Sequence, residues 1–251
     1  MKRRPFVPPP PSTVWTRRSV VEWLGKATVV ALGADLLAAC GDYGDYETTT
    51  LPGADCDDPQ YPFAPNADDI GLYDSWKVRT VDPQQVAALA SRWRLVVDGL
   101  VANPIELSFA ELIELPRQDQ VTDFHCVEGW SVLDVPWNGV HLSEIFRLVE
   151  PLEAATHATF TSFGDVYVES LPLDEALEPK TMLGYGVGCN TLPLDHGFPL
   201  RVVIPRKFGY KNAKTIQRIE LTDHPVNGYW VERGYSYEAD VQPERLRPGK
   251  H

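Results

Sequence analysis

Polar and hydrophobic residues alternate over several short stretches of the chain, a period typical of strands that bury one face. One stretch ends in a turn signal at Gly99, and two others flank Gly164 as a hairpin would. A further apolar run lies between prolines, which suits a fully buried strand. We therefore expect strands over residues 93–101, 121–126, 158–163, 165–171, 200–204 and 216–221.

Helical patterns in the sequence are short. One begins at Ser108, carries Glu111 three positions later and stops at Pro116, which predicts two helical turns with a capping box. The other helical stretches are 83–90, 142–149 (capped near His141 and Ser143) and 173–177. Short strands mixed with short helices, without a regular βαβ alternation, predict an α+β fold.

Residues 1–39 read as an export signal rather than as part of this fold. The segment Thr16-Arg17-Arg18-Ser19 resembles a twin-arginine signal, and the apolar stretch 27–39 that follows is too short for a transmembrane helix. Leu37-Ala38-Ala39-Cys40-Gly41 resembles a lipoprotein cleavage box with Cys40 as the lipidated residue. We expect a periplasmic protein, or one on the outer face of the cytoplasmic membrane; an ordinary amphipathic helix is the alternative.

The remaining chain divides by composition into three parts. Residues 40–82 are acidic with several prolines and predict a tether, 83–240 hold the periodic patterns and predict one domain, and 241–251 predict a weakly ordered tail. In an oxidising compartment Cys56 could pair with Cys189, but connectivity cannot be read from sequence, so this pairing is left open.

The net charge of -12 over 251 residues argues against a nucleic-acid partner, because phosphate binding needs a basic face. A pocket can still differ in sign from the whole chain. Four basic residues gather within a short span and predict such a local positive site: Arg201, Lys207, Lys211 and Lys214.

One cysteine stands in an unusual setting, the stretch Phe124-His125-Cys126-Val127-Glu128-Gly129-Trp130-Ser131. A thiolate is a soft ligand that suits a transition metal, and the absence of a second cysteine two residues away excludes the usual closed zinc or iron–sulfur spacings. We interpret Cys126 as a metal-bound thiolate. His125 and Glu128 either orient it through hydrogen bonds or are ordinary polar residues of the loop. The alternative for Cys126 is a buried structural thiol.

A second stretch lies seventy residues further on, LPLDHGFPLRVVIP over 192–205 followed by KFGYKNAK over 207–214. Together the two stretches resemble the sulfite oxidase family of molybdenum enzymes, over about 93–235. The Cys-Val-Glu-x-Trp-Ser pattern is similar to that of its periplasmic methionine sulfoxide reductase branch. The resemblance implies molybdenum and molybdopterin as cofactors, with Cys126 as the catalytic metal ligand and Tyr235 beside the metal. It implies cofactor contacts from Ser162, His196, Arg201, Asn212, Ala213, Lys214 and, near Asp74, Tyr73.

These inferences predict a molybdopterin oxidoreductase that transfers an oxygen atom in a two-electron step and reduces S- or N-oxides. In the sulfite-oxidising branch of the family that the chain resembles, a Gly-Asn-Arg-Arg-like run follows the cysteine and helps hold the doubly charged anion. Residues 127–131 have no arginine and carry Glu128 instead, which disfavours sulfite as the substrate. Sulfite oxidation remains one alternative, and a metal-free, lipid-anchored binding protein is the other. The sequence has no Cys-x-x-Cys-His haem motif, so we expect a separate electron partner, quinone-linked or a cytochrome. We expect a monomer, since no immunoglobulin-like dimerisation domain follows.

Overall fold

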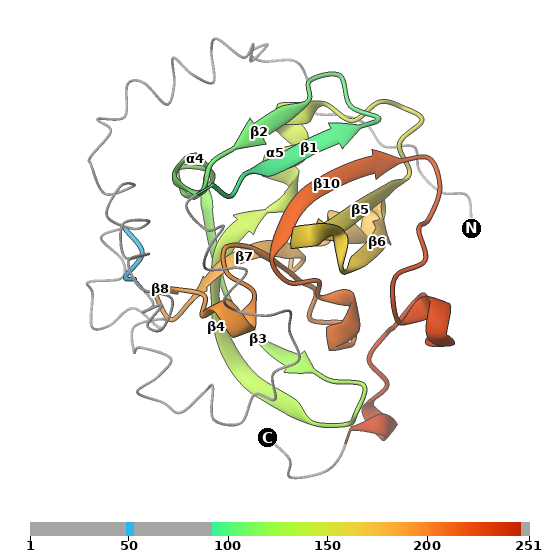
Figure 1. Cartoon of the computed structure of the whole chain (residues 1–251). Coiled ribbons are helices and arrows are strands. Elements are labelled where there is room, and N and C mark those ends of the chain that lie inside the picture. The colour runs from blue at the N-terminus through green and yellow to red at the C-terminus, as the bar shows by residue number, and fades with distance from the viewer. Residues whose placement is uncertain (1–48, 53–91, 247–251) are drawn as a thin grey trace. The chain divides into compact units, whose positions relative to one another are not determined.

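The computed structural model describes residues 49–52 and 92–246, which form two five-stranded sheets with a few short helices (Figure 1). This architecture confirms the α+β expectation. The expected export signal, most of the tether including Tyr73, and the helix at 83–90 lie outside the described residues. Within the described part of the chain, no helix is long and apolar enough to cross a membrane.

The first sheet has the strand order β2-β1-β10-β5-β6. Strand β1 runs parallel to β10, and the other neighbours are antiparallel. The alternating pattern in the sequence buries one face of each strand, so Leu95, Val97, Phe160 and Ile219 have no exposed surface. The bounds are Leu95–Gly99 (β1), Ile105–Leu107 (β2), His157–Ser162 (β5), Val168–Pro172 (β6) and Ile216–Thr222 (β10).

The second sheet contains β3, β4, β7 and β8 in that order, with β9 also paired to β7. A long antiparallel hairpin, β3–β4, forms one side of it (Figure 1). Strand β7 packs closely on its neighbours, because a Cβ at Gly186 would lie 2.5 Å from the backbone oxygen of Asn190. The bounds are Arg117–His125 (β3), Ser131–His141 (β4), Met182–Val187 (β7), Asn190–Thr191 (β8) and Arg201–Val203 (β9).

The helices follow the sequence signals. Helix α4 has the expected capping box: the Ser108 hydroxyl accepts from the Glu111 amide, and the Glu111 carboxylate accepts from the Ser108 amide. The bounds are Phe109–Ile113 (α4), Leu142–Val149 (α5) and Leu173–Ala176 (α6). Short 3-10 turns span Phe163–Asp165 (η3), Leu194–His196 (η4), Gly209–Lys211 (η5), Val231–Arg233 (η6) and Pro243–Arg245 (η7).

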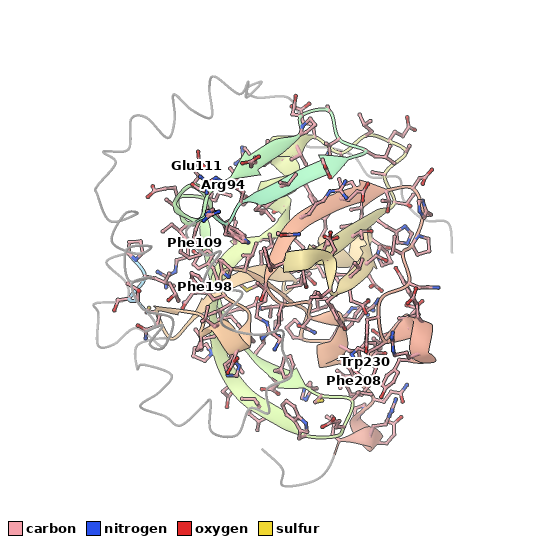
Figure 2. The ribbon with its side chains drawn as sticks, viewed as in Figure 1. Arg94, Phe109, Glu111, Phe198, Phe208 and Trp230 are labelled. Atoms are coloured by element: carbon pink, nitrogen blue, oxygen red, sulfur yellow. The ribbon has the colours of Figure 1, made fainter. Side chains whose placement is uncertain are left out.

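Aromatic side chains connect α4 with both sheets. The rings of Phe109 and Phe198, labelled in Figure 2, lie 5.4 Å apart. The Phe109 ring also lies 6.3 Å from those of Tyr185 and Trp93. The indole of Trp93 also donates to the backbone oxygen of Ile216 at 2.8 Å. This buried cluster joins the segment before β1, strand β7 and the turn before β9, so it fixes the loops that follow η4.

Cys189 is disulfide-bonded in the structure. Its partner lies outside the described residues, so the pairing with Cys56 remains a prediction. Cys189 has a positive φ of 61°, and its amide donates to the side-chain oxygen of Asn138 at 2.7 Å.

Candidate active site

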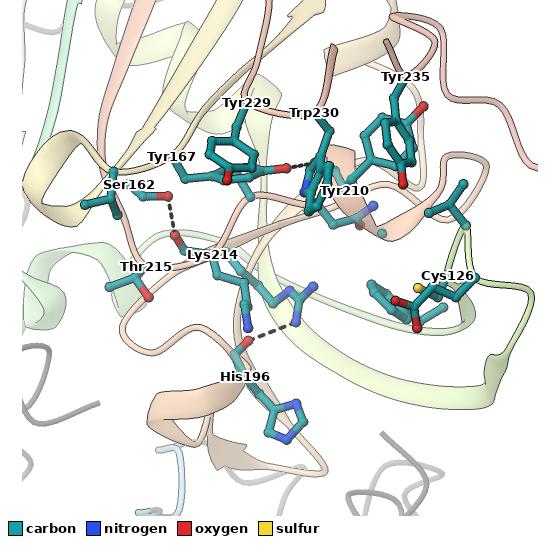
Figure 3. A pocket seen from close by; sticks show the side chains of 18 of the residues that line it. Cys126, Ser162, Tyr167, His196, Tyr210, Lys214, Thr215, Tyr229, Trp230 and Tyr235 are labelled. Carbon is teal, nitrogen blue, oxygen red and sulfur yellow. Dashed lines mark hydrogen bonds between the residues drawn. The ribbon is translucent and has the colours of Figure 1, made fainter. Parts of the chain in front are cut away.

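A cavity of about 630 Å³ opens where the β3–β4 turn, the β5–β6 connection and the loops on either side of β9 and β10 meet (Figure 3). The structure brings together every expected site residue that it describes. Those lining the cavity are Cys126, Ser162, His196, Arg201, Asn212, Ala213, Lys214 and Tyr235. They come from segments separated by more than a hundred residues in the chain, so the fold builds one site from them.

Cys126 lies at the tip of the β3–β4 hairpin. The Gly129 amide donates to the Cys126 carbonyl at 2.9 Å, the Cys126 amide donates to the Trp130 carbonyl at 2.9 Å, and Gly129 has a φ of 94°. These backbone hydrogen bonds fix the tight turn, which needs glycine at its left-handed position. The half-buried side chain keeps its thiol and faces the cavity.

The Cys126 hairpin packs closely on the loop after β9. A Cβ at Gly209 would lie 2.4 Å from the ring of Phe124, so only glycine permits this approach. Within the hairpin, His125 Nδ1 lies 2.7 Å from Ser131 Oγ, and Trp130 Nε1 donates to the Glu128 carboxylate at 3.2 Å. Glu128 lines the cavity, whereas His125 ends strand β3 and pairs with Ser131 at the start of β4.

Two cations face the cavity, Arg201 buried and Lys214 half-buried. Arg201 on β9 is 2% exposed; its guanidinium donates to the His196 carbonyl at 2.8 Å and stacks on Phe124 and Trp137. Lys214 Nζ donates to the Asp195 carbonyl at 2.8 Å. Burial, and then the charge of Arg201, lowers the pKa of Lys214 to about 7. The same causes, together with Lys214, lower the pKa of His196 to about 3. The site therefore carries a positive potential that an anion would relieve.

The expected group of four cations is only half correct. Lys207 Nζ lies 3.0 Å from the Glu175 carboxylate and donates to the Glu238 carbonyl at 2.6 Å, and Lys211 Nζ lies 2.8 Å from the Glu169 carboxylate. Both lysines are buried in ion pairs outside the cavity lining. A sequence pattern cannot show this, because their acidic partners are distant in the chain.

Three of the expected residues use their polar groups to shape the cavity. The Asn212 side-chain oxygen accepts from the Ile204 amide at 2.7 Å. The Ala213 carbonyl accepts from the Val202 amide at 2.8 Å, and Ser162 Oγ donates to the Lys214 carbonyl at 2.6 Å. These bonds hold the loop from 204 to 214 against β9 and β5.

Thr215 is a site residue that the sequence analysis missed. It lines the cavity, is 1% exposed and has a φ of 54°, a costly conformation for a β-branched residue. Within residues 49–52 and 92–246 its buried hydroxyl has no hydrogen-bond partner, which costs about 1–3 kcal/mol unless a ligand supplies one. Strain and an unsatisfied donor at one position indicate a ligand contact, and neither can be read from the letters Lys214-Thr215.

Aromatic side chains close the opposite side of the cavity. This aromatic wall consists of Tyr167, Tyr210, Tyr229, Trp230 and Tyr235, and Figure 3 shows the last three together across from Lys214 and His196. The ring of Tyr235 lies 5.1 Å from Trp230 and 5.4 Å from Tyr210. The Tyr167 hydroxyl donates to the Tyr210 carbonyl at 2.5 Å. Only Tyr235 was expected here from the sequence.

A thiol, two cations and an unsatisfied hydroxyl in one cavity suit a phosphate-bearing cofactor with a soft metal. The family described as "Oxidoreductase molybdopterin binding domain" matches residues 81–230, more than half of the chain. The chain belongs to this family, the sulfite oxidase family. It therefore carries a molybdopterin-binding oxidoreductase domain.

Relatives with curated names share this domain. The chain is 36% identical over 176 residues to the "Protein-methionine-sulfoxide reductase catalytic subunit MsrP" of Gluconobacter oxydans, covering 62% of the chain and 56% of the relative. It is 38% identical over 176 residues to the "Putative protein-methionine-sulfoxide reductase subunit YedZ1" of Azospira oryzae, covering 70% and 62%. The chain thus spans less than two thirds of the length of these relatives.

A solved structure has a similar fold. The "Sulfane Dehydrogenase SoxCD from Paracoccus pantotrophus" matches 60% of the chain and 41% of its own with a TM-score of 0.51 at 19% identity. At that identity the similarity supports the sulfite-oxidase-like fold alone.

The shifted pKa of Lys214 predicts a pH-dependent stability. Because the folded, cofactor-free protein holds this lysine at a pKa of about 7, below the 10.5 of the unfolded chain, the unfolded state binds more protons between these values. The free energy of unfolding contributed by Lys214 should therefore rise as pH increases from 7 to 10.5. Denaturant titrations of cofactor-free protein should give Lys214→Met a higher free energy of unfolding than wild type at pH 7. This difference should shrink by pH 10. A constant difference would contradict the burial of a charged Lys214.

Proposed function

We propose that the protein reduces S- or N-oxides by two-electron oxygen-atom transfer, using molybdenum bound by molybdopterin and by the thiolate of Cys126. The observation that carries this proposal is the convergence of Cys126, Arg201, Lys214 and Thr215 on one cavity. The cofactor supplies the redox chemistry, and the protein supplies binding, orientation and electrostatics.

Each residue has a distinct task in this proposal. The Arg201 guanidinium and the Lys214 ammonium bind the cofactor phosphate, and the Thr215 hydroxyl gains the hydrogen bond that it lacks. His196, held neutral by its low pKa, presents an uncharged imidazole to the pterin. Removal of oxygen as water consumes two protons, and Tyr235 at the cavity wall is the candidate to hold one at the substrate oxygen.

The charges around Cys126 favour a substrate whose reacting sulfur group carries no net charge. Glu128 lines the cavity beside the thiol, and the cavity cations Arg201 and Lys214 are assigned to the cofactor. The Arg233 guanidinium is already engaged, because it lies 3.5 Å from the centre of the Tyr229 ring and donates to the Tyr229 carbonyl. Arg206 is held by Glu175 and Glu178, and Arg79 lies outside the described residues. The names of the relatives, methionine sulfoxide reductases, agree with an S-oxide substrate.

A steady-state comparison tests this preference. With an artificial electron carrier in the appropriate redox state, kcat/KM for methionine sulfoxide should exceed that for sulfite by at least about tenfold, since one unfavourable unit-charge contact is worth a few kcal/mol before screening. Glu128→Gln should raise kcat/KM for sulfite and so reduce the preference for methionine sulfoxide. The control Glu144→Gln, on α5 and outside the cavity lining, should leave this preference unchanged. A sulfite kcat/KM far above that of every S- and N-oxide would show the oxidase alternative to be right.

Further proposals concern the setting of the enzyme. We propose that the twin-arginine signal in 1–39 directs export to the periplasm or to the outer face of the cytoplasmic membrane. Residues 40–82 form an acidic tether with Cys40 as a candidate lipid anchor, residues 83–240 form the catalytic domain, and residues 241–251 form a tail. The protein is proposed to be a monomer. Electrons would come from a separate quinone-linked or cytochrome partner. These points are tested by purifying the exported protein, measuring its molecular mass, and identifying the redox partners that purify with it.

A further inference from the structure

The segment from Val226 to Tyr237, which carries three members of the aromatic wall, is fastened at both ends to one residue of β6. Ser170 Oγ donates to the Val226 carbonyl and accepts from the Val226 amide, both at 2.9 Å. The same hydroxyl lies 2.9 Å from the Tyr237 hydroxyl. One serine therefore closes a loop of ten intervening residues, including Tyr229, Trp230 and Tyr235.

A buried ion pair lies beneath this loop. Glu169 of β6 and Lys211 of η5 are joined at 2.8 Å, and each side chain is 1% exposed. Lys211 Nζ also donates to the Ser170 carbonyl at 3.1 Å and lies 4.0 Å from the centre of the Tyr237 ring. Lys211 thus connects Ser170 on β6 with Tyr237, the last residue of the loop.

The start of the loop is closed onto the Glu169 carboxylate. A Cβ at Gly228 would lie 2.1 Å from Glu169 Oε1, so the backbone approaches as closely as glycine allows. That oxygen is buried and has no hydrogen-bond partner in the part of the chain that the structure describes. Stability alone does not require such an arrangement, because apolar residues of similar volume often serve a protein core as well as a buried ion pair does.

The ion pair also reaches the remaining two tyrosines of the wall. Tyr167 is two residues before Glu169, and Tyr210 directly precedes Lys211. Burial, followed by the charge of Glu169, raises the pKa of Tyr167 and raises that of Tyr210 to about 12. Both hydroxyls stay protonated and donate to backbone carbonyls, Tyr167 to Tyr210 and Tyr210 to Ser236 at 2.8 Å.

We propose that Glu169, Ser170, Lys211 and Tyr237, the β6 polar cluster, are positioning residues that hold the aromatic wall, and with it Tyr235, in place for the substrate. The cluster lies outside the cavity lining and acts through the residues it fastens. The predicted change in kcat/KM for the S-oxide rests on the proposed function, whereas the predicted loosening of residues 226–237 does not. An experiment can therefore contradict one without contradicting the other.

The test replaces the ion pair by a neutral pair of similar shape, Glu169→Gln with Lys211→Met. The control is Asp98→Asn with Arg218→Met, which removes the ion pair between β1 and β10 and leaves the contacts of Ser170, Lys211 and Tyr237 intact. In cofactor-loaded protein, amide exchange in 226–237 should accelerate about tenfold in the first variant and stay unchanged in the control, as expected when the contacts that close a local segment are lost. kcat/KM for methionine sulfoxide should fall about tenfold in the first variant at unchanged molybdopterin content, mostly through KM.

Tyr237→Phe provides a milder variant that removes one hydroxyl and keeps the ring over Lys211. Exchange in 226–237 should then rise about threefold to tenfold, the loss expected for a single hydrogen bond. Unchanged exchange in both cluster variants, or an equal increase in the control, would overturn the proposal. A loosened loop with unchanged kcat/KM would overturn the positioning role. If the wild type reduces no S- or N-oxide, the proposed function fails, and the exchange data still decide whether the cluster holds the loop.

Discussion

Cys126→Ser should give a folded protein that retains molybdopterin and loses at least about a hundredfold in turnover, more than the 10–100-fold typical of losing a group that only orients a ligand. The hydroxyl of serine is a poor substitute for a soft thiolate. The turn that holds the residue depends on backbone bonds between Cys126, Gly129 and Trp130, which the substitution leaves intact. Turnover, pterin content and thermal unfolding of the same preparations measure the three parts of this expectation.

Val127→Ala is the control for the same turn. It changes the neighbouring cavity residue but keeps the thiol, so turnover should stay within a few-fold of wild type, as expected when only part of an apolar contact is removed. Equal losses in Cys126→Ser and Val127→Ala would show that the turn, not the thiolate, matters. Wild-type turnover in Cys126→Ser would end the assignment of Cys126 as a ligand.

Arg201→Ala should lower the amount of bound cofactor rather than only the rate. Loss of a charge-assisted hydrogen bond to phosphate costs about 1.5–3 kcal/mol, which corresponds to roughly 10–150-fold weaker binding. Lys214→Ala should act in the same direction through the second cation of the cavity. Molybdenum and pterin contents of the purified variants, each per mole of protein, measure the effect.

The arginine control is Arg218→Ala on β10. Its side chain is 40% exposed and pairs with Asp98 and Glu220 at 3.0 Å, away from the cavity. Exposed ion pairs contribute about 0–1 kcal/mol, so neither cofactor content nor turnover should change appreciably. Full cofactor content in both Arg201→Ala and Lys214→Ala would contradict the binding role of the cavity cations.

The elements that the sequence predicted are those with a local cause. The capping box at Ser108 defined α4, the apolar face of 142–149 defined α5, and alternation defined β1 and β10. Strand β7 gave no such pattern, because all six of its residues are buried and two are glycines that permit close approach of neighbours. Strand β4 was also missed, since Pro136 interrupts a strand pattern that its pairing with β3 and β7 nevertheless sustains.

The site divides in a similar way. Cys126, Arg201 and Lys214 could be selected from motifs, and the fold brings them to one cavity. Thr215 and Tyr167 could not, because their roles arise from a backbone conformation, an unsatisfied hydroxyl and contacts across the fold. For the same reason Lys207 and Lys211 were wrongly placed in the site: burial against Glu175 and Glu169 is a tertiary fact.

The cofactor content of the exported full chain tests the central claim most directly. Protein made in a host that loads a related molybdenum enzyme should contain molybdenum and molybdopterin in equimolar amounts with the chain, and Cys126→Ser should keep the pterin. This result would support the cavity of Cys126, Arg201, Lys214 and Thr215 as a molybdenum–molybdopterin site. Correctly exported, folded protein with neither molybdenum nor pterin would contradict the account and favour a binding protein on the same fold.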